Sequence, residues 1–173
     1  MKRKVKVLLT LVISISALVV PKATATDFLV EIDGIVVSLH DYSVLTGKLN
    51  NKLNAADMKS QVSKLNNQLT LVRKNIVLFD KDLSYNWKVL IDNDNVNYPH
   101  RQLLKEFNNQ VFDWFNYELQ IQKKSNACFM KKTNEVECVL AVRKASKNIE
   151  LTKYKALTET LSSIQAWRTR YGR

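Results

Sequence analysis

Apolar and polar positions follow their most regular pattern in the middle of the chain, where apolar residues recur every three or four positions over almost four heptads. Such spacing holds an apolar stripe on one side of a helix and favours shallow-angle packing against another helix. We therefore predict a long helix over residues 54–90. Its stripe comprises Met58, Val62, Leu65, Leu69, Val72, Ile76, Phe79 and Leu83, and Leu71, Val77 and Leu78 widen the stripe toward the far end.

The side chains that flank this stripe distinguish two kinds of helix packing. Asn66, Gln68 and Asn75 are amides, whereas helices that select a separate chain as their partner usually carry opposite charges beside the stripe. The pattern therefore favours packing within one chain. An intermolecular coiled coil is the alternative.

Two more helices are predicted after the polar residues 92–97. Pro99 suits the first turn of a helix, and apolar residues then recur every three or four positions to about residue 124. Asn134 followed by Glu137 is typical of a helix start, and this last helix runs nearly to Gly172. The expected buried side chains are Leu104, Phe107, Val111, Trp114, Phe115 and Leu119 in the second helix, and Val139, Val142, Ile149, Tyr154, Leu157, Leu161, Ile164 and Trp167 in the third.

The segment before these helices, residues 26–52, has a different pattern. Asp33 and Gly34 separate two apolar runs over residues 28–32 and 35–39, and an Asp-Gly pair suits a two-residue hairpin turn. The second run does not alternate cleanly, so an irregular segment leading into a helix is the alternative. The predicted fold is mainly α: an antiparallel bundle of three long helices over residues 53–173, with a short N-terminal β-hairpin over residues 28–39.

Residues 1–25 have the pattern of a cleaved export signal. Basic residues precede an uncharged run over residues 7–20, and small residues at Ala23 and Ala25 suit cleavage before Thr26. The run is 14 residues long, shorter than the roughly 20 apolar residues that cross a bilayer. No second stretch of spanning length follows, so we expect a periplasmic or extracellular protein that is not integral to the membrane after cleavage. The basic residues are Lys2, Arg3, Lys4 and Lys6.

The net charge indicates what kinds of partner the exported protein can attract. Lys and Arg number 27 against 16 Asp and Glu, and five of the basic residues, the four named above and Lys22, lie in the leader, which leaves an excess of about +6. This excess permits binding to an acidic protein or an anionic envelope surface. Nucleic acid is not an expected partner outside the cytoplasm.

Two cysteines in an exported protein most simply form one disulfide, and here these are Cys128 and Cys138. A straight helix would separate two residues ten positions apart by about 15 Å, whereas disulfide-bonded Cα atoms lie about 4.4 to 6.8 Å apart. The chain must therefore turn back between the two cysteines.

The sequence contains no pattern typical of a catalytic, cofactor or metal site. The two histidines, His40 and His100, are far apart and lack metal-ligand spacing, and the acidic residues 92–95 do not continue as a calcium-binding loop. Glu106, Asp113 and Glu118 share one predicted helix, where we expect them on a solvated surface. We therefore predict a protein that is not an enzyme.

Two clusters of aromatic, apolar and basic residues are candidate binding surfaces. The first is the disulfide-closed turn and the second is the C-terminal tail, in which aromatic and arginine side chains are common interface anchors. Cations near a helix C-terminus also simply complement its dipole. The residues are Phe129, Met130, Lys131 and Lys132 in the turn, and Trp167, Arg168, Arg170 and Tyr171 in the tail.

About 45 residues, from 128 to 171, resemble small secreted bacterial lysozyme inhibitors with paired cysteines and a tryptophan, tyrosine and arginine ending. The resemblance rests on Cys128, Glu135, Cys138, Leu151, Tyr154, Leu157, Ala166, Trp167, Arg168 and Tyr171. This chain lacks their further terminal cysteine, and its two cysteines are closer together.

These observations lead to one functional expectation and one alternative. We expect an exported bacterial envelope protein that binds another protein without catalysis, as an inhibitor, immunity factor or adaptor. The alternative is a structural subunit of a pilus or secretion apparatus whose heptad helix packs between copies. The identity of the partner and the oligomeric state are left open by the sequence.

Overall fold

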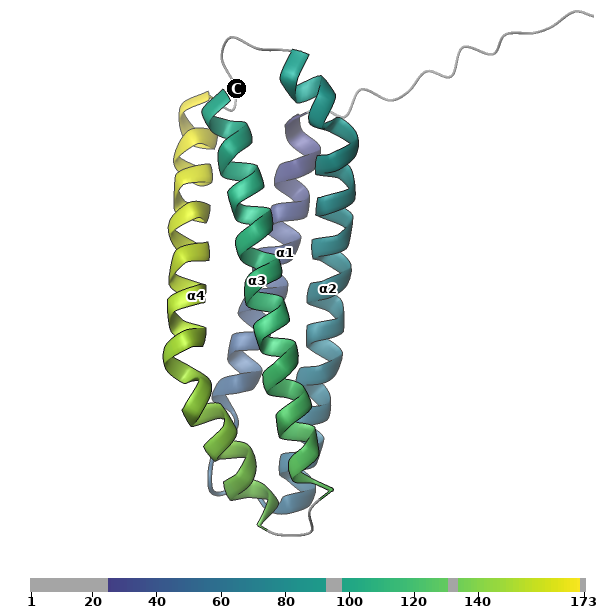
Figure 1. Ribbon diagram of the computed structural model, residues 1–173, viewed down its shortest axis with the longest axis vertical. Coiled ribbons are helices and arrows are strands. Elements are labelled where there is room, and N and C mark those ends of the chain that lie inside the picture. Colours follow the sequence, from purple (N-terminus) through teal and green to yellow (C-terminus); the bar gives the residue numbers. More distant parts are fainter. Residues whose placement is uncertain (1–24, 93–97, 131–133, 172–173) are drawn as a thin grey trace, which may run out of the picture.

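The computed structural model describes residues 25–92, 98–130 and 134–171, and this part of the chain forms four antiparallel helices (Figure 1). The helices are α1 (Ala25–Gly47), α2 (Ala55–Asp92), α3 (Tyr98–Cys128) and α4 (Glu135–Tyr171). The mainly α class is confirmed, and the three predicted long helices correspond to α2, α3 and α4. The expected leader, except for Ala25, lies outside the described residues, as do Lys131 and Lys132.

The predicted N-terminal hairpin is wrong, because residues 28–39 lie within α1. The buried residues Ile32, Ile35, Leu39 and Tyr42 are spaced by three and four positions, which places them on one side of a helix. Their packing outweighs the preference of the Asp-Gly pair for a turn. Gly34 is accommodated in the helix, where its carbonyl oxygen accepts a hydrogen bond from Asn75 Nδ2 in α2 at 3.1 Å.

The predicted stripe on α2 is confirmed, since all eight of its residues are buried. Helix α2 begins where the Asn54 side chain accepts a hydrogen bond from the Asp57 amide at 2.8 Å, a typical N-terminal cap. The expected widening of the stripe is wrong, because Leu71, Val77 and Leu78 are each about half exposed. These three side chains therefore belong to the surface.

The main core contains buried residues from all four helices. Within the described chain, α1 approaches only α2 to within 8 Å between Cα atoms, and α4 packs mostly against α3. Long side chains such as Tyr42 therefore make the contacts between α1 and the α3–α4 pair. The prediction for α4 needs one correction, because Ile149 is 51% exposed.

The predicted disulfide joins Cys128 at the end of α3 to Cys138 in the first turn of α4, with a Cα separation of 5.7 Å. A second, smaller core lies beside it and contains Met58, Val62 and Val139. The disulfide therefore fastens the α3–α4 turn at the end of the bundle where α2 begins. None of the described helices is both long enough and apolar enough to traverse a bilayer.

Candidate functional site

The two predicted binding surfaces lie at opposite ends of the bundle (Figure 1). Cys138 lies in the first turn of α4 and Trp167 in its last, about 44 Å apart at 1.5 Å per residue. In the tail, Trp167 is half-buried and Arg170 is exposed, whereas the side chains of Arg168 and Tyr171 are outside the described part. The fold therefore separates the tail from the disulfide-closed turn.

The disulfide end presents an exposed methionine. We call this region, made of Cys128, Phe129, Met130 and Cys138, the stapled end. Met130 is 84% exposed, whereas Phe129 is half-buried against the small core. The turn is further fixed by backbone hydrogen bonds from the amides of Phe129 and Met130 to carbonyl oxygens in the last turn of α3, at 3.2 Å each. A large flexible apolar side chain is thus held in water on a rigid support.

A groove between α2 and α3 starts at the stapled end. Its first part is a depression of about 340 Å³ lined by Lys59, Ser63, Asn66, Asn126, Phe129 and Met130. Its second part, about 250 Å³, shares Asn66 and is lined further by Leu69, Thr70, Arg73, Phe115 and Leu119. Apolar side chains contribute to the lining of both parts, and Lys59 and Arg73 give the lining a positive charge.

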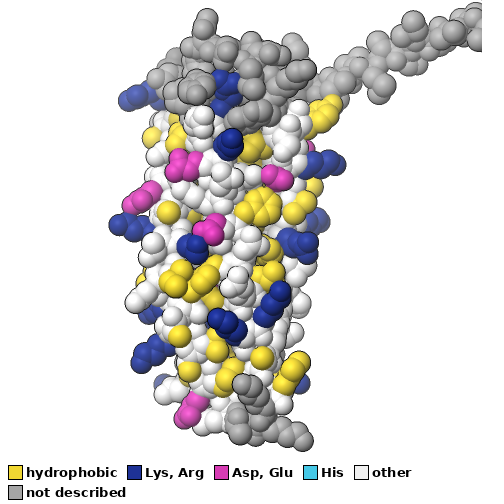
Figure 2. All heavy atoms as spheres, viewed as in Figure 1, with side chains coloured by type: hydrophobic (Ala, Val, Ile, Leu, Met, Phe, Trp, Pro, Cys, Tyr) yellow, Lys and Arg dark blue, Asp and Glu magenta, His cyan; other side chains and the backbone are white. Residues whose placement is uncertain are grey.

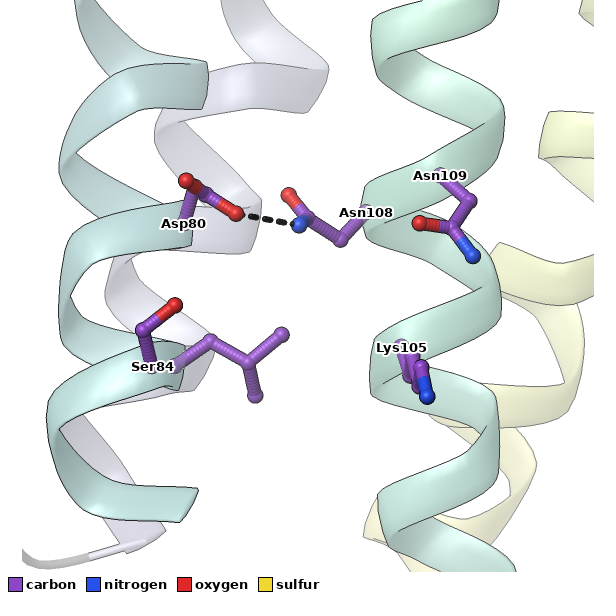
Figure 3. A pocket seen from close by; sticks show the side chains of 6 residues that line it. Asp80, Ser84, Lys105, Asn108 and Asn109 are labelled. Atoms are coloured by element: carbon purple, nitrogen blue, oxygen red, sulfur yellow. Dashed lines mark hydrogen bonds between the residues drawn. The ribbon is translucent and has the colours of Figure 1, made fainter.

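A third depression of about 400 Å³ lies farther along α2 and α3 (Figure 3). Here Asn108 Nδ2 donates a hydrogen bond to Asp80 Oδ1 at 2.7 Å, which links the two helices. Ser84 and Lys105 also line this depression. The first two depressions, which share Asn66, extend from Lys59 to Arg73, about 21 Å along α2. We call these two the α2–α3 groove.

The surface on the α3 side mixes charge and apolar area. Figure 2 shows Lys and Arg side chains along both edges and across the middle of this face, with apolar side chains and a few acidic ones among them. This face therefore offers apolar contact area beside positive charge.

A second polar arrangement is buried where α1, α3 and α4 meet. Tyr42 donates a hydrogen bond to Glu118 Oε2 at 2.5 Å and accepts bonds from Gln122 at 2.8 Å and Arg143 at 3.1 Å. Arg143 also pairs with Glu118 Oε2 at 2.9 Å. We call these four residues the buried polar cluster.

Burial and neighbouring charges alter the acidity of this region. Burial and the nearby Glu118 raise the pKa of the Tyr42 hydroxyl, so the hydroxyl keeps its proton and acts as a donor. Burial lowers the pKa of Arg143, but Tyr42 and Glu118 more than offset that effect and the pKa of Arg143 is raised. Arg143 is therefore charged and neutralises Glu118.

Glu150 in α4 adds a second carboxyl group beside the buried polar cluster. Burial, followed by the negative charge of Glu118, raises the pKa of Glu150 from 4.5 to about 7. Glu118 Oε1 is buried without a hydrogen-bond donor, and the Glu150 carboxyl is within hydrogen-bonding reach of Glu118. If Glu150 is protonated, its carboxyl group can donate a hydrogen bond to the Glu118 carboxylate.

The expectation that Glu118 lies on a solvated surface is wrong, because its side chain is fully buried. The signal for burial is its spacing: Val111, Trp114 and Glu118 continue the three and four pattern of the buried side of α3. Arg143 and Glu150 occupy the matching buried side of α4. The heptad pattern therefore includes polar positions that pair with one another.

These polar residues link α1, α3 and α4 in the interior of the bundle. Glu118 and Arg143 are enclosed by the bundle, and Tyr42 packs edge to face against Trp114 at 5.4 Å between ring centroids. Among the described residues, no three His, Cys, Asp or Glu side chains are grouped so that they could hold a metal ion. The α2–α3 groove, which is open to solvent, is the better candidate site.

No family model, curated protein or solved structure matches this chain. The candidate site is therefore argued from the residues of this chain alone. The resemblance to lysozyme inhibitors is supported only by the sequence positions named for it.

Proposed function

We propose that this chain is an exported, non-catalytic helical protein that binds a partner protein through the stapled end and the adjoining α2–α3 groove. The observation that carries the proposal is Met130, which is 84% exposed at the mouth of a depression and fixed beside a disulfide. Methionine adapts its shape to a partner and is frequent at binding surfaces. A rigid support lowers the entropy that such an anchor loses on binding.

The chemistry of the groove indicates what kind of partner it suits. The half-buried Leu119 and Phe129 supply apolar contact area, and Lys59 and Arg73 supply positive charge. A segment with apolar side chains on one side and acidic side chains on the other would satisfy both, as in helix-in-groove recognition. Electrostatic attraction would also accelerate the encounter of the two proteins.

Photocrosslinking in living cells tests this proposal, because it captures a partner whose identity is still unknown. A photoreactive phenylalanine analogue replaces Met130 in one strain and Lys155 in another. Lys155 is the matched control because its side chain is 77% exposed on α4, away from the groove. We expect a discrete crosslinked protein from position 130, identified by mass spectrometry, and none from position 155.

A charge reversal then tests the role of the groove. Arg73→Glu should reduce the yield of the crosslink from position 130, whereas Lys144→Glu, an exposed change on α4, should leave it unchanged. Absence of a crosslink at position 130, or the same products from positions 130 and 155, would contradict the proposal.

A further inference from the structure

Two exposed apolar stripes lie on α1 and α2. Val30, Val37 and Val44 recur every seven residues on α1 and are 46–67% exposed. Leu71, Leu78 and Tyr85 recur every seven residues on α2, with the same range of exposure. Seven residues make almost two helical turns, so each set forms one stripe along its helix.

The two stripes face the same way. On α1, Gly34 and Ser38 mark the side that contacts α2, because their carbonyl oxygens accept hydrogen bonds from Asn75 and Gln68. Successive residues of an α-helix are rotated by about 100° around its axis. The valine stripe is therefore rotated by roughly 80° from the side of α1 that contacts α2, and it lies almost opposite the core. On α2, Gln68 and Asn75 mark the side that contacts α1, and the stripe of Leu71, Leu78 and Tyr85 is rotated around the helix axis by roughly 70° from that side. Because the two helices are antiparallel, these two rotations bring both stripes to the same surface of the bundle. We call the resulting surface the α1–α2 face.

Helix α1 is therefore apolar on two sides, one in the core and one on the α1–α2 face. A helix that is apolar on opposite sides is normally covered on both. The heptad spacing of the outer stripes also suits packing against further helices.

Charge indicates what covers this face. Helix α1 contains four acidic residues, Asp27, Glu31, Asp33 and Asp41, and no Lys or Arg. Helix α2 instead places the exposed side chains of Lys64, Lys74 and Lys81 beside its stripe. Of the acidic residues on α1, Asp33 and Asp41 are exposed and flank the valine stripe. They form a short acidic strip alongside the basic strip of α2.

We propose that the α1–α2 face binds a second copy of this chain in a twofold homodimer. With the twofold axis parallel to the helices, α1 of one copy lies against α2 of the other, and every residue keeps its height along the bundle. The contact between Gly34 and Asn75 sets this height. Asp33 then lies within about 3 Å in height of Lys74 of the other copy, and Val37 within about 1.5 Å of Leu71. Asp41 and Lys64 are offset by about one helical turn, a distance that a lysine side chain can bridge.

The competing arrangements are disfavoured by the same charges. A twofold axis perpendicular to the helices would place the acidic α1 against itself. A helix that lies on an anionic membrane is typically rich in Lys and Arg on its polar side, and α1 has neither. The second copy is therefore the occupant that fits both strips.

Sedimentation equilibrium of the full-length gene product isolated from expressing cells tests the dimer. We expect a dimer, and we expect Val37→Glu to raise its dissociation constant about tenfold or more. Leu151→Glu is the matched control, since Leu151 is 54% exposed on α4, outside the α1–α2 face. Circular dichroism confirms that both variants keep their helices.

A charge exchange tests the arrangement of the copies. Asp41→Lys and Lys64→Asp should each weaken the dimer, and the double variant should restore it at low salt, where exposed charges are least screened. A monomeric wild type, equal weakening by Val37→Glu and Leu151→Glu, or a wild type that is monomeric but binds phosphatidylglycerol vesicles would each overturn the proposal.

Discussion

Replacement of Arg143 by methionine is predicted to destabilise the bundle strongly. Arg143 is nearly buried and neutralises the fully buried Glu118 at 2.9 Å. Methionine fills similar space but leaves the carboxylate without its positive partner and beside Glu150. Removal of one member of a buried ion pair typically costs about 3 to 5 kcal/mol, because the other charge is left uncompensated. The loss of the 3.1 Å hydrogen bond to the Tyr42 hydroxyl belongs to the same cost.

The companion variant Glu118→Gln separates this explanation from simple loss of packing. Glutamine has no charge to compensate and still offers an oxygen to the Tyr42 hydroxyl. The double variant Glu118→Gln with Arg143→Met should therefore recover about 2 kcal/mol of the loss caused by Arg143→Met alone, a coupling typical of residues in contact.

Urea denaturation followed by circular dichroism measures the free energy of unfolding of each variant. The comparison requires that the m-value, the slope of this free energy against urea concentration, is the same for all variants. At pH 5 the cost of Arg143→Met should be smaller than at pH 8, because Glu150, whose pKa is about 7, is then protonated and adds no second negative charge beside Glu118. A cost below about 1 kcal/mol for Arg143→Met, or an equal cost in the single and double variants, would refute the reasoning.

Three further predictions concern stability. Gly34→Ala should stabilise the protein by about 0.5 to 1 kcal/mol in urea denaturation, because alanine is the better helix former and its Cβ would meet Asn75 at an ordinary 3.9 Å; a loss of stability would contradict a helical Gly34. The folded-state pKa of Glu150 is about 7, above its ordinary 4.5, so the stability from this group is full below about pH 4.5 and is lost as the pH rises through 7. Glu150→Gln should flatten this dependence and stabilise the protein by roughly 1 kcal/mol at pH 8 after allowance for solvent screening, whereas an unchanged pH profile would argue against the raised pKa. Replacement of both Cys128 and Cys138 by serine should cost about 2 to 3 kcal/mol, and no change in the urea midpoint would contradict a stabilising staple.

The sequence predicts those parts of the fold in which the apolar pattern is unbroken. All eight stripe residues of α2 are buried, because a heptad repeat without polar interruption leaves only one side for packing. The disulfide is equally predictable, since a chain with two cysteines has one possible intrachain pairing. Both features depend on local spacing or on residue counts.

Features that depend on contacts between distant segments are not predictable in the same way. Asp33 and Gly34 favour a turn locally, and only the packing of Ile35 and Tyr42 against other helices makes that segment helical. The spacing of Glu118 places it on the buried side of α3, but the residues that satisfy its carboxylate, Tyr42 and Arg143, lie 76 and 25 residues away along the chain and are not indicated by that local pattern.

The candidate site is predictable only in part. The sequence points to Met130 and Phe129, because a disulfide-closed turn with apolar residues indicates a contact surface. It does not predict the α2–α3 groove that continues from them, since the groove lining combines residues such as Arg73 and Phe115 from two helices. The C-terminal tail, the other predicted surface, lies at the opposite end of the bundle.

Methionine oxidation tests the binding role of the stapled end most directly. Met58 is fully buried and Met130 is 84% exposed, so dilute hydrogen peroxide should oxidise Met130 first and leave Met58 as an internal reference. The control is the variant Lys155→Met, which carries a second exposed methionine, on α4 and away from the groove. Slower oxidation at position 155 measures how much oxidant the extract consumes, without protection by a partner. If the account is correct, native envelope extract slows oxidation at Met130 several-fold relative to position 155; equal slowing at both positions would contradict it.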